Sequence, residues 1–414
     1  MNSINQKIYE PTPNKGFKKA WLVFILGSLT AFGPLSMDMY LPALPVVTTD
    51  LHTSASLAQL SITSCLLGLA LGQLIFGPLS DIQGRKRPLL TTLSVYTVVS
   101  LLAAFSHHIW IFIVLRFIQG ISAAAGIVIA RASAKDLFDG KELTKFIALL
   151  ALVNGAAPIL APLFGGVILN WISWRAVFYV LALVGLIMLA GVLLTLKETL
   201  PEEKRSKGGM LATVQTFGIL LKDRTFMGIA LTQAFISMCM FAYIAGSPFV
   251  LQNIYNISAQ QFSLVFAING VGIILAAQLT GKLAPIIDEI KLLRTGVMIS
   301  FTGSCLLFIV VLFHLPLWVM LPALFLVVSS VGMVNTTSFS LGMQRQGKIA
   351  GSASAFLGIL PFGGGGLVSP LVGIGGDATA IPMGVTIFAC SLIGIILFKI
   401  MIKDTSLTSS ISEA

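Results

Sequence analysis

Apolar residues form long, nearly uninterrupted windows along most of the chain, and short polar clusters separate them. A helix needs about 20 consecutive apolar residues to cross the hydrocarbon core of a bilayer, because the core is about 30 Å thick and a helix rises about 1.5 Å per residue. The pattern predicts an all-α membrane protein with twelve transmembrane helices. The windows begin near Ala20, Leu57, Pro88, Ile109, Leu143, Trp174, Thr225, Ala259, Lys291, Pro316, Ala350 and Ala380.

The composition excludes a soluble globular protein. Of the 414 residues, 56% are hydrophobic and only 10% are charged. Soluble domains carry about 25% charged residues, so a single soluble core has no room for this many apolar side chains. The four cysteines lie inside apolar windows without a paired spacing, and we interpret them as small core residues rather than as metal or redox sites.

The basic residues predict the orientation in the membrane. Loops on the cytoplasmic side retain Lys and Arg during insertion, and here every second loop is basic whereas Arg175 stands alone on the other side. We therefore expect both termini to be cytoplasmic, and the net charge of +10 does not indicate a nucleic-acid-binding surface. The basic residues assigned to the cytoplasmic side are Lys15, Lys18, Lys19, Arg85, Lys86, Arg87, Arg131, Lys135, Lys141, Lys145, those from Lys197 to Arg224 and from Lys282 to Arg294, Arg345, Lys348, Lys399 and Lys403.

A charged stretch near the middle of the chain, KETLPEEKRSK from Lys197 to Lys207, predicts a boundary between two halves. Pro162 with Gly165 recurs as Pro370 with Gly373, which is a weak internal repeat. Two pseudo-symmetric halves around a midplane site form one known transporter architecture. The predicted units are an N-terminal six-helix half (1–196), a cytoplasmic linker (197–224) and a C-terminal six-helix half (225–414).

Two ionisable residues fall inside the predicted spans, Asp38 and Arg116. Such groups are costly in lipid and mark functional sites. At about 1.5 Å per residue, Asp38 lies about 27 Å along the first span and Arg116 about 10 Å into the fourth, so both are in the outer half of the bilayer. Burial disfavours a charged Asp38 and a neighbouring Arg favours it, so this pair is our hypothesis for proton coupling. A purely structural ion pair is the alternative.

The segment GPLSDIQGRKRP, from Gly77 to Pro88, contains a tight charged turn after the second span. We expect Gly77 to allow close helix approach and Gly84 to supply the turn. We expect Asp81 to cap a helix N-terminus or to pair with Arg85 or Arg131. A charged turn without further function is the alternative. The segment resembles the signature of the major facilitator superfamily. RFIQG in the fourth span, with Arg116, Gln119 and Gly120, resembles that superfamily's motif at this position.

The fifth span contains APILAPLFGG, in which two prolines bend a helix rich in small residues. It resembles the antiporter motif of drug-exporting major facilitators, with Ala157 and Ala161 in place of two usual glycines. A kinked packing helix is the alternative. The motif residues are Pro158, Pro162, Gly165 and Gly166.

The run MDMYLPALP, from Met37 to Pro45, resembles the Bcr/CflA group of drug:proton antiporters. The resemblance implies that Asp38 couples protons, that Arg116 supports it, and that Asp81 and Arg85 stabilise the state closed to the cytoplasm. The second acid that some related exporters carry in their first helix is absent here.

Flexible Met and flat aromatic side chains suit varied apolar ligands, and a few amides could orient them. Lipid contact or helix packing is the alternative for each. The candidate substrate-binding residues are Tyr40, Asn154, Phe235, Met238, Phe241 and Asn335.

Together these features predict a monomeric, multi-pass transporter of the cell membrane that exports small, largely apolar drugs in exchange for protons, without a cofactor, a metal or a nucleic-acid partner. A proton-coupled importer of a small metabolite with the same fold is the alternative. A membrane enzyme would need a polar catalytic cluster inside the spans, and an ATP-driven pump would need a phosphate-binding loop. Neither occurs in this sequence.

Overall fold

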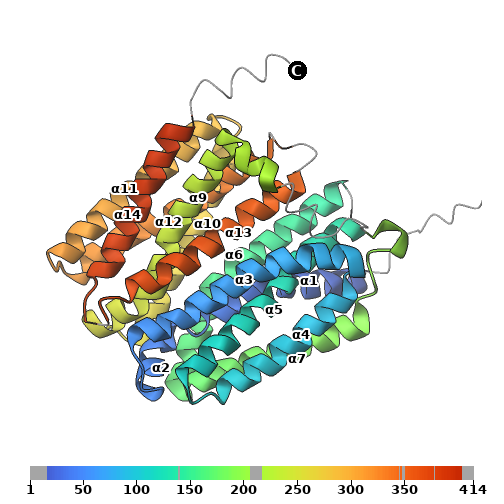
Figure 1. Ribbon diagram of the computed structural model, residues 1–414, viewed down its shortest axis with the longest axis horizontal. Coiled ribbons are helices and arrows are strands. Elements are labelled where there is room, and N and C mark those ends of the chain that lie inside the picture. The colour runs from blue at the N-terminus through green and yellow to red at the C-terminus, as the bar shows by residue number, and fades with distance from the viewer. Residues whose placement is uncertain are drawn as a thin grey trace, which may run out of the picture.

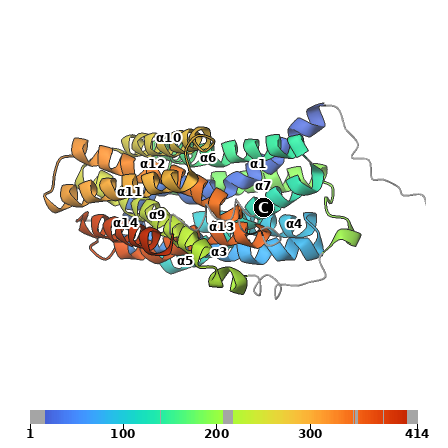
Figure 2. The same cartoon turned by 90° about the horizontal axis from the view of Figure 1, so that it is seen from above.

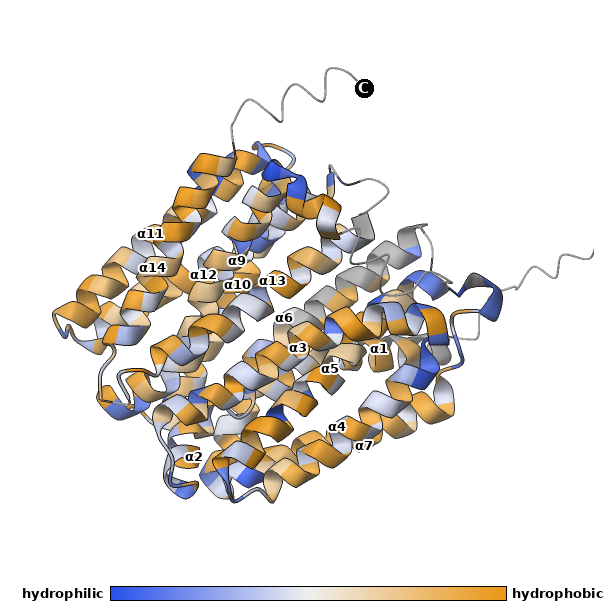
Figure 3. Cartoon of the chain, viewed as in Figure 1, coloured by the Kyte–Doolittle hydropathy of each residue, from blue (hydrophilic) through white to orange (hydrophobic). Residues whose placement is uncertain are grey.

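The protein is described by a computed structural model that covers residues 16–138, 140–205, 217–344, 346, 350–376 and 378–402. Long helices dominate it, as the windows predict, and Figure 3 shows apolar residues along most of the length of the helices that it colours. In the first half they are α1 (Gly16–Asp38), α3 (Ala55–Gln83), α4 (Lys86–Ala104), α5 (Ile109–Leu137), α6 (Gly140–Trp171) and α7 (Trp174–Thr195). In the second half they are α9 (Arg224–Phe249), α10 (Ala259–Leu283), α11 (Glu289–Leu312), α12 (Leu317–Gln344), α13 (Ala350–Val372) and α14 (Ile381–Met401).

Ten of these helices are long and apolar enough to cross a membrane. The other two, α1 and α6, are helices at the first and fifth predicted windows, so the count of twelve spans stays a prediction. After α1 the chain turns through a 3₁₀ helix (Leu41–Ala43) into the short helix α2 (Leu44–Asp50).

Local capping explains where several helices begin. The Asp223 carboxylate accepts hydrogen bonds from the backbone N–H groups of Thr225 and Phe226 at the start of α9, both at 3.0 Å. Ser258 and Gln261 form a reciprocal capping box at the start of α10. These side chains satisfy backbone donors that the first turn of a helix leaves unpaired.

The helices form two groups that lie side by side, α1 to α7 and α9 to α14 (Figure 1). The view from above shows the same division (Figure 2). Between the groups, α3 packs against α13 and α6 packs against α10. Several residues of the linker, 206–216, lie outside the described part of the chain. The same holds for the side chains of Lys15, Lys18, Lys19, Lys141, Lys145, Arg345, Lys348 and Lys403, which helped to predict the orientation.

Hydrogen bonds between the two groups lie at the end of the bundle where α3 begins and α13 ends. Ser56 donates to the carbonyl of Gly373, and Gln252 donates to the carbonyl of Pro42 at 3.2 Å. A Cβ added at Gly373 would meet Ser56 and the side chain of Gln59. Gln59 is fully buried there, and neither atom of its side-chain amide has a hydrogen-bond partner. The two groups are therefore tightly closed at this end.

Candidate functional site

Asp38 is the last residue of α1, where the helix gives way to the turn before α2. Its side chain is buried, with 2% of the residue exposed, and its Oδ1 atom has no hydrogen-bond partner. Buried carboxyl oxygens are almost always paired, so an unpaired one marks a strained or functional group. Asp38, which the sequence analysis singles out for its charge inside an apolar window, thus has a buried carboxyl group with an unpaired oxygen.

Arg116 of α5 is fully buried near Asp38 and is the charged group that acts on it electrostatically. Its Nη1 donates to the side-chain oxygen of Gln119, and Gln119 in turn donates to Ser100 at 2.7 Å. Its guanidinium lies over the ring of Tyr40, 4.8 Å from the centroid. Within the described chain no ion pair of 4.0 Å or less joins Arg116 to Asp38. Arg116 Nε and Nη2 also lack hydrogen-bond partners.

The C-terminal group of helices contributes a polar pair that sequence reasoning did not place at the site. Tyr243 of α9 accepts a hydrogen bond of 2.9 Å from the Asn269 amide of α10, and both residues are buried. Tyr243 lies within electrostatic reach of Asp38. One feature of the sequence could have pointed to this pair: a tyrosine inside an apolar window needs a hydrogen-bond partner for its hydroxyl. In the structure that partner is the amide of Asn269.

The charged turn between α3 and α4 forms a network centred on Arg85. Its side chain binds Asp81 at 2.5 Å and Asp136 of α5 at 2.9 Å. Burial alone lowers the pKa of Arg85, but these two carboxylates outweigh it and the pKa is raised. Gly84, in the turn between α3 and α4, has a φ of +89°, a backbone conformation that favours glycine.

The expectation for Gly77 is not supported. A Cβ added at Gly77 would lie 3.7 Å from a methyl group of Val128, which is ordinary contact, so close helix approach does not require glycine at this position. In contrast, Gly120 of the RFIQG motif lies against the backbone carbonyl of Cys65 in α3, where a side chain would collide.

Sequence reasoning missed Glu198, which follows α7 and joins the same network. Its carboxylate accepts hydrogen bonds from the backbone N–H groups of Arg85 at 2.7 Å and Lys86 at 3.1 Å, and from that of Leu200 at 3.0 Å. Burial raises the pKa of Glu198, but these hydrogen bonds and the charge of Arg205 lower it, and the net pKa is below the ordinary value. The feature of the sequence that could have identified Glu198 is its position, because it is an acidic residue directly after a predicted span.

The antiporter-like segment lies in α6, with Pro158 and Pro162 inside the helix. Gly165 lies against the backbone carbonyl of Met39, one residue after Asp38. Gly166 faces Ser263 of α10, and its carbonyl accepts a hydrogen bond of 3.3 Å from Gln260. The small residues therefore allow α6 to pack closely against the turn after α1 and against the other group of helices.

Four of the predicted substrate residues belong to one buried hydrophobic cluster or pack against it: Tyr40, Phe235, Met238 and Phe241. Tyr40 is fully enclosed, with its hydroxyl bonded to Ser61. The others contact neighbouring helices: Met238 and Phe241 of α9 lie against Gly364 and Gly365 of α13, Phe235 lies against Gly394 of α14, and Asn335 of α12 accepts a hydrogen bond from Ser237. The side chain of Asn154 lies outside the described part of the chain.

In the part of the chain that the structure describes, no group of three His, Cys, Asp or Glu side chains is placed to hold a metal ion.

Comparison with known proteins identifies the relatives of this chain. It is 45% identical over 399 residues to the uncharacterized MFS-type transporter YdgK of Bacillus subtilis, covering 96% of this chain and 98% of the relative. It is 30% identical to the bicyclomycin resistance protein homolog of Haemophilus influenzae, covering 92% and 96% of the two chains. It is 31% identical to a chloramphenicol resistance protein of Pseudomonas aeruginosa, covering 70% and 68%.

Among solved structures, the nucleoside transporter NupG superposes with a TM-score of 0.75 at 13% sequence identity, covering 93% of this chain and 100% of that one. This likeness shows the shared fold. Residues 26–370 match the family described as Major Facilitator Superfamily. The chain belongs to this superfamily, and it is a multi-pass transporter of the cell membrane rather than an enzyme.

Proposed function

We propose that this transporter exports small, largely apolar drugs or toxic compounds in exchange for protons, with Asp38 as the proton-carrying residue. The names of two relatives, for bicyclomycin and chloramphenicol resistance, favour export of such compounds over import of a metabolite. The observation that carries the proposal is the buried, unpaired carboxyl oxygen of Asp38 near the equally under-paired Arg116.

The coupling follows from the cost of charge in a low-dielectric site. A protonated Asp38 is neutral and tolerates its apolar surroundings, whereas a carboxylate there needs a cation or a hydrogen-bond donor. Arg116 has two guanidinium nitrogens available for this purpose, and Tyr243 of the opposite group of helices is within electrostatic reach. Loss of the proton thus favours a shift of these groups toward Asp38, which links protonation to the arrangement of the two halves.

The proposed topology has twelve spans and cytoplasmic termini, with halves at 1–196 and 225–414 joined by a linker at 197–224. In this orientation the contact between Ser56 and Gly373 closes the outer side. Arg85 binds Asp81 and Asp136 within its own half. This arrangement suits a conformation that exchanges ligands with the cytoplasm. We also propose that the protein functions as a monomer, with the substrate residues Phe235, Met238, Phe241 and Asn335 near the path of the cargo.

The test uses a drug-sensitive bacterium that lacks its main exporters. Cells expressing wild type, Asp38→Asn or the control Glu202→Gln are loaded with a panel of dyes and antibiotics, and accumulation is followed with and without a protonophore. Glu202 is a suitable control because it is an exposed acid outside the helical bundle. We expect wild type and Glu202→Gln to lower accumulation of at least one compound, and the protonophore or Asp38→Asn to abolish this at equal membrane levels.

An unchanged accumulation with wild type would refute export, and growth on single nutrients would then test the importer alternative. Full efflux by Asp38→Asn would refute the assignment of the proton to Asp38.

A further inference from the structure

Arg116 is a buried cation that lies against two aromatic rings. Its guanidinium is 4.8 Å from the ring centroid of Tyr40 and 5.6 Å from that of Phe178. It donates one hydrogen bond, to Gln119, and in the described part of the chain no acid forms an ion pair with it at 4.0 Å or less. A buried charge is costly unless other groups compensate it, and the negative face of an aromatic ring attracts a cation. The two rings therefore offset part of the cost of burying Arg116.

Neighbouring side chains hold both rings in place. The hydroxyl of Tyr40 is hydrogen-bonded to Ser61. Phe178 of α7 is fully buried, and the rings of Phe112 and Trp174 meet its ring nearly at right angles, with centroids 5.3 Å and 6.0 Å away. Edge-to-face contacts of this kind are favourable and select one orientation of the ring. The aromatic surface beside Arg116 is therefore preformed.

Arg116 is also the cation that faces Asp38. Among the described residues, the titratable or charged groups that act on Asp38 are Arg116 of α5, Cys65 of α3 and Tyr243 of α9. Cysteine and tyrosine are ordinarily neutral at pH 7, so Arg116 supplies the charge. The guanidinium thus has two alternative partners: the aromatic rings when Asp38 is protonated, and the Asp38 carboxylate when the proton leaves.

We infer that Phe178 is a positioning residue for proton coupling, because its ring holds Arg116 away from Asp38 while Asp38 is protonated. Weakening the attraction to the ring favours the ion pair between Arg116 and Asp38. The ion pair contains the charged carboxylate, so a lower pH is then needed to protonate Asp38. The attraction of a buried cation to one ring is large enough to move this titration by about 0.5–1 pH unit. The inference rests on the proposed role of Asp38, and it does not depend on which cargo is exported.

The experiment changes the charge on the face of the ring while keeping the shape of the ring. Phenylalanines with increasing numbers of ring fluorines are incorporated at position 178 of the full-length protein by nonsense suppression, because fluorine withdraws the electron density that attracts a cation. Phe178→Leu removes the aromatic face altogether. The same fluorine series at Phe226 is the matched control, since this ring is also buried but lies against the ring of Phe356.

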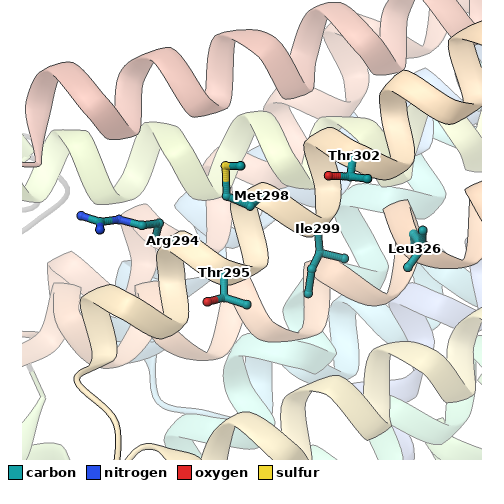
Figure 4. Close-up of a pocket in the computed structure, with 6 residues that line it drawn as sticks. All are labelled: Arg294, Thr295, Met298, Ile299, Thr302 and Leu326. Atoms are coloured by element: carbon teal, nitrogen blue, oxygen red, sulfur yellow. The ribbon is translucent and has the colours of Figure 1, made fainter.

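Met298→Ala is a second control, for the loss of apolar volume elsewhere in the bundle. Met298 lines a cavity of about 330 Å³ on α11 and α12, which Figure 4 shows. This cavity shares no residue with the aromatic surface beside Arg116. Thermal unfolding of every variant confirms that it is folded.

The readout is the infrared C=O stretching band of protonated Asp38 in the reconstituted protein. The band is identified as the one that Asp38→Asn removes, and it is followed over a series of pH values. We expect its midpoint to fall stepwise with the number of fluorines at position 178, and by about 0.5–1 pH unit in Phe178→Leu. The Phe226 series and Met298→Ala should keep the wild-type midpoint. An unchanged or higher midpoint across the Phe178 series overturns the inference.

Dye efflux by the same proteins distinguishes failure of this inference from failure of the proposed function. If Asp38→Asn removes no titrating band and keeps full efflux, the proposed role of Asp38 fails, and this inference fails with it. If Asp38 titrates in wild type and Asp38→Asn loses efflux, but the fluorines at position 178 have no effect, then Phe178 only packs against Arg116 and the proposed function stands.

Discussion

At the scale of single residues, one buried guanidinium organises the polar centre of the N-terminal half. Arg116 stacks over Tyr40 and Phe178 and donates to Gln119, which continues the chain of hydrogen bonds to Ser100. The stacking depends on the planar shape of the guanidinium, and the hydrogen bond to Gln119 depends on its N–H donors. A lysine, which has only the positive charge, could not make the same contacts.

We predict that Arg116→Lys lowers both stability and transport. Lysine keeps the charge but loses the stacking and the fixed geometry toward Gln119, and a hydrogen bond to a charged group contributes about 1.5–3 kcal/mol. The variant should unfold several degrees below wild type, and its efflux rate should fall about tenfold. The measurements are thermal unfolding in detergent and dye efflux at equal expression.

Arg175→Lys is the matched control for this prediction. Arg175 also stacks on an aromatic ring, that of Trp174, but it pairs with an acid, Asp50, and it lies partly exposed at one end of the bundle. Its replacement should change efflux little. Equal losses in the two variants would show that the effect is not specific to the site of Asp38.

At the scale of elements, α4 receives its N-terminal cap from outside its own sequence. Arg85, the residue before the helix, provides no side-chain cap, and the carboxylate of Glu198 accepts from the first backbone donors instead. A negative charge at this end also interacts favourably with the helix dipole. Glu198 thereby ties the segment after α7 to the turn after α3.

The stabilisation by Glu198 should depend on pH. Its pKa in the folded protein is below the ordinary value, so the charged form favours folding, and its contribution is present at neutral pH and is lost as the pH falls through the folded pKa. At pH 7, Glu198→Gln should be less stable than wild type by about 1 kcal/mol, in the range of other lost helix caps. The difference should shrink below pH of about 4, where glutamate also becomes protonated in unfolded chains.

Denaturant unfolding at several pH values measures this difference, with Glu203→Gln, at an exposed acid, as the control that should show none. A stability difference that grows on acidification would contradict the sign derived from the hydrogen bonds.

Because α6 packs closely against its neighbours, we predict that an alanine substitution in α6 has a much larger effect than one at an open glycine of α10. A methyl group at Gly165 would collide with the backbone carbonyl of Met39, whereas nothing lies within 4 Å of a Cβ added at Gly281 at the end of α10. Gly165→Ala should therefore destabilise the fold and lower efflux severalfold. Gly281→Ala should be neutral or stabilising by up to about 1 kcal/mol, because alanine is the better helix former.

Thermal unfolding and efflux of the two variants provide the test. A fully active, fully stable Gly165→Ala would show that α6 moves away from Met39 at little cost.

At the scale of the whole molecule, the contact at Gly373 closes the two groups of helices together at one end of the bundle. Gly373→Val should prevent this closure, because the larger side chain would overlap Ser56 and Gln59. Spin labels placed by His107→Cys and His314→Cys, on exposed loops of opposite halves, should lie farther apart in this variant than in the wild-type background. The measurement is the distance distribution by double electron–electron resonance, and an unchanged distribution would contradict the prediction.

The sequence predicts the helical architecture well because each lipid-exposed helix must meet the same length and hydropathy requirement. It also selects Asp38 and Arg116, since charge is conspicuous in an apolar window. It could not show that the two residues remain apart in this conformation, because that depends on tertiary packing. Glu198 and the Tyr243–Asn269 pair were not assigned to the site for the same reason: their partners lie far away in the chain.

The buried amide of Gln59 opposes closure of the two groups of helices at this end of the bundle. Leaving such a group without partners costs about 1–3 kcal/mol, and this cost disappears when the end opens to water. The cost of burying the Gln59 amide therefore opposes the contact between Ser56 and Gly373. This cost lowers the free energy that a bound proton or ligand must supply to open this end of the bundle.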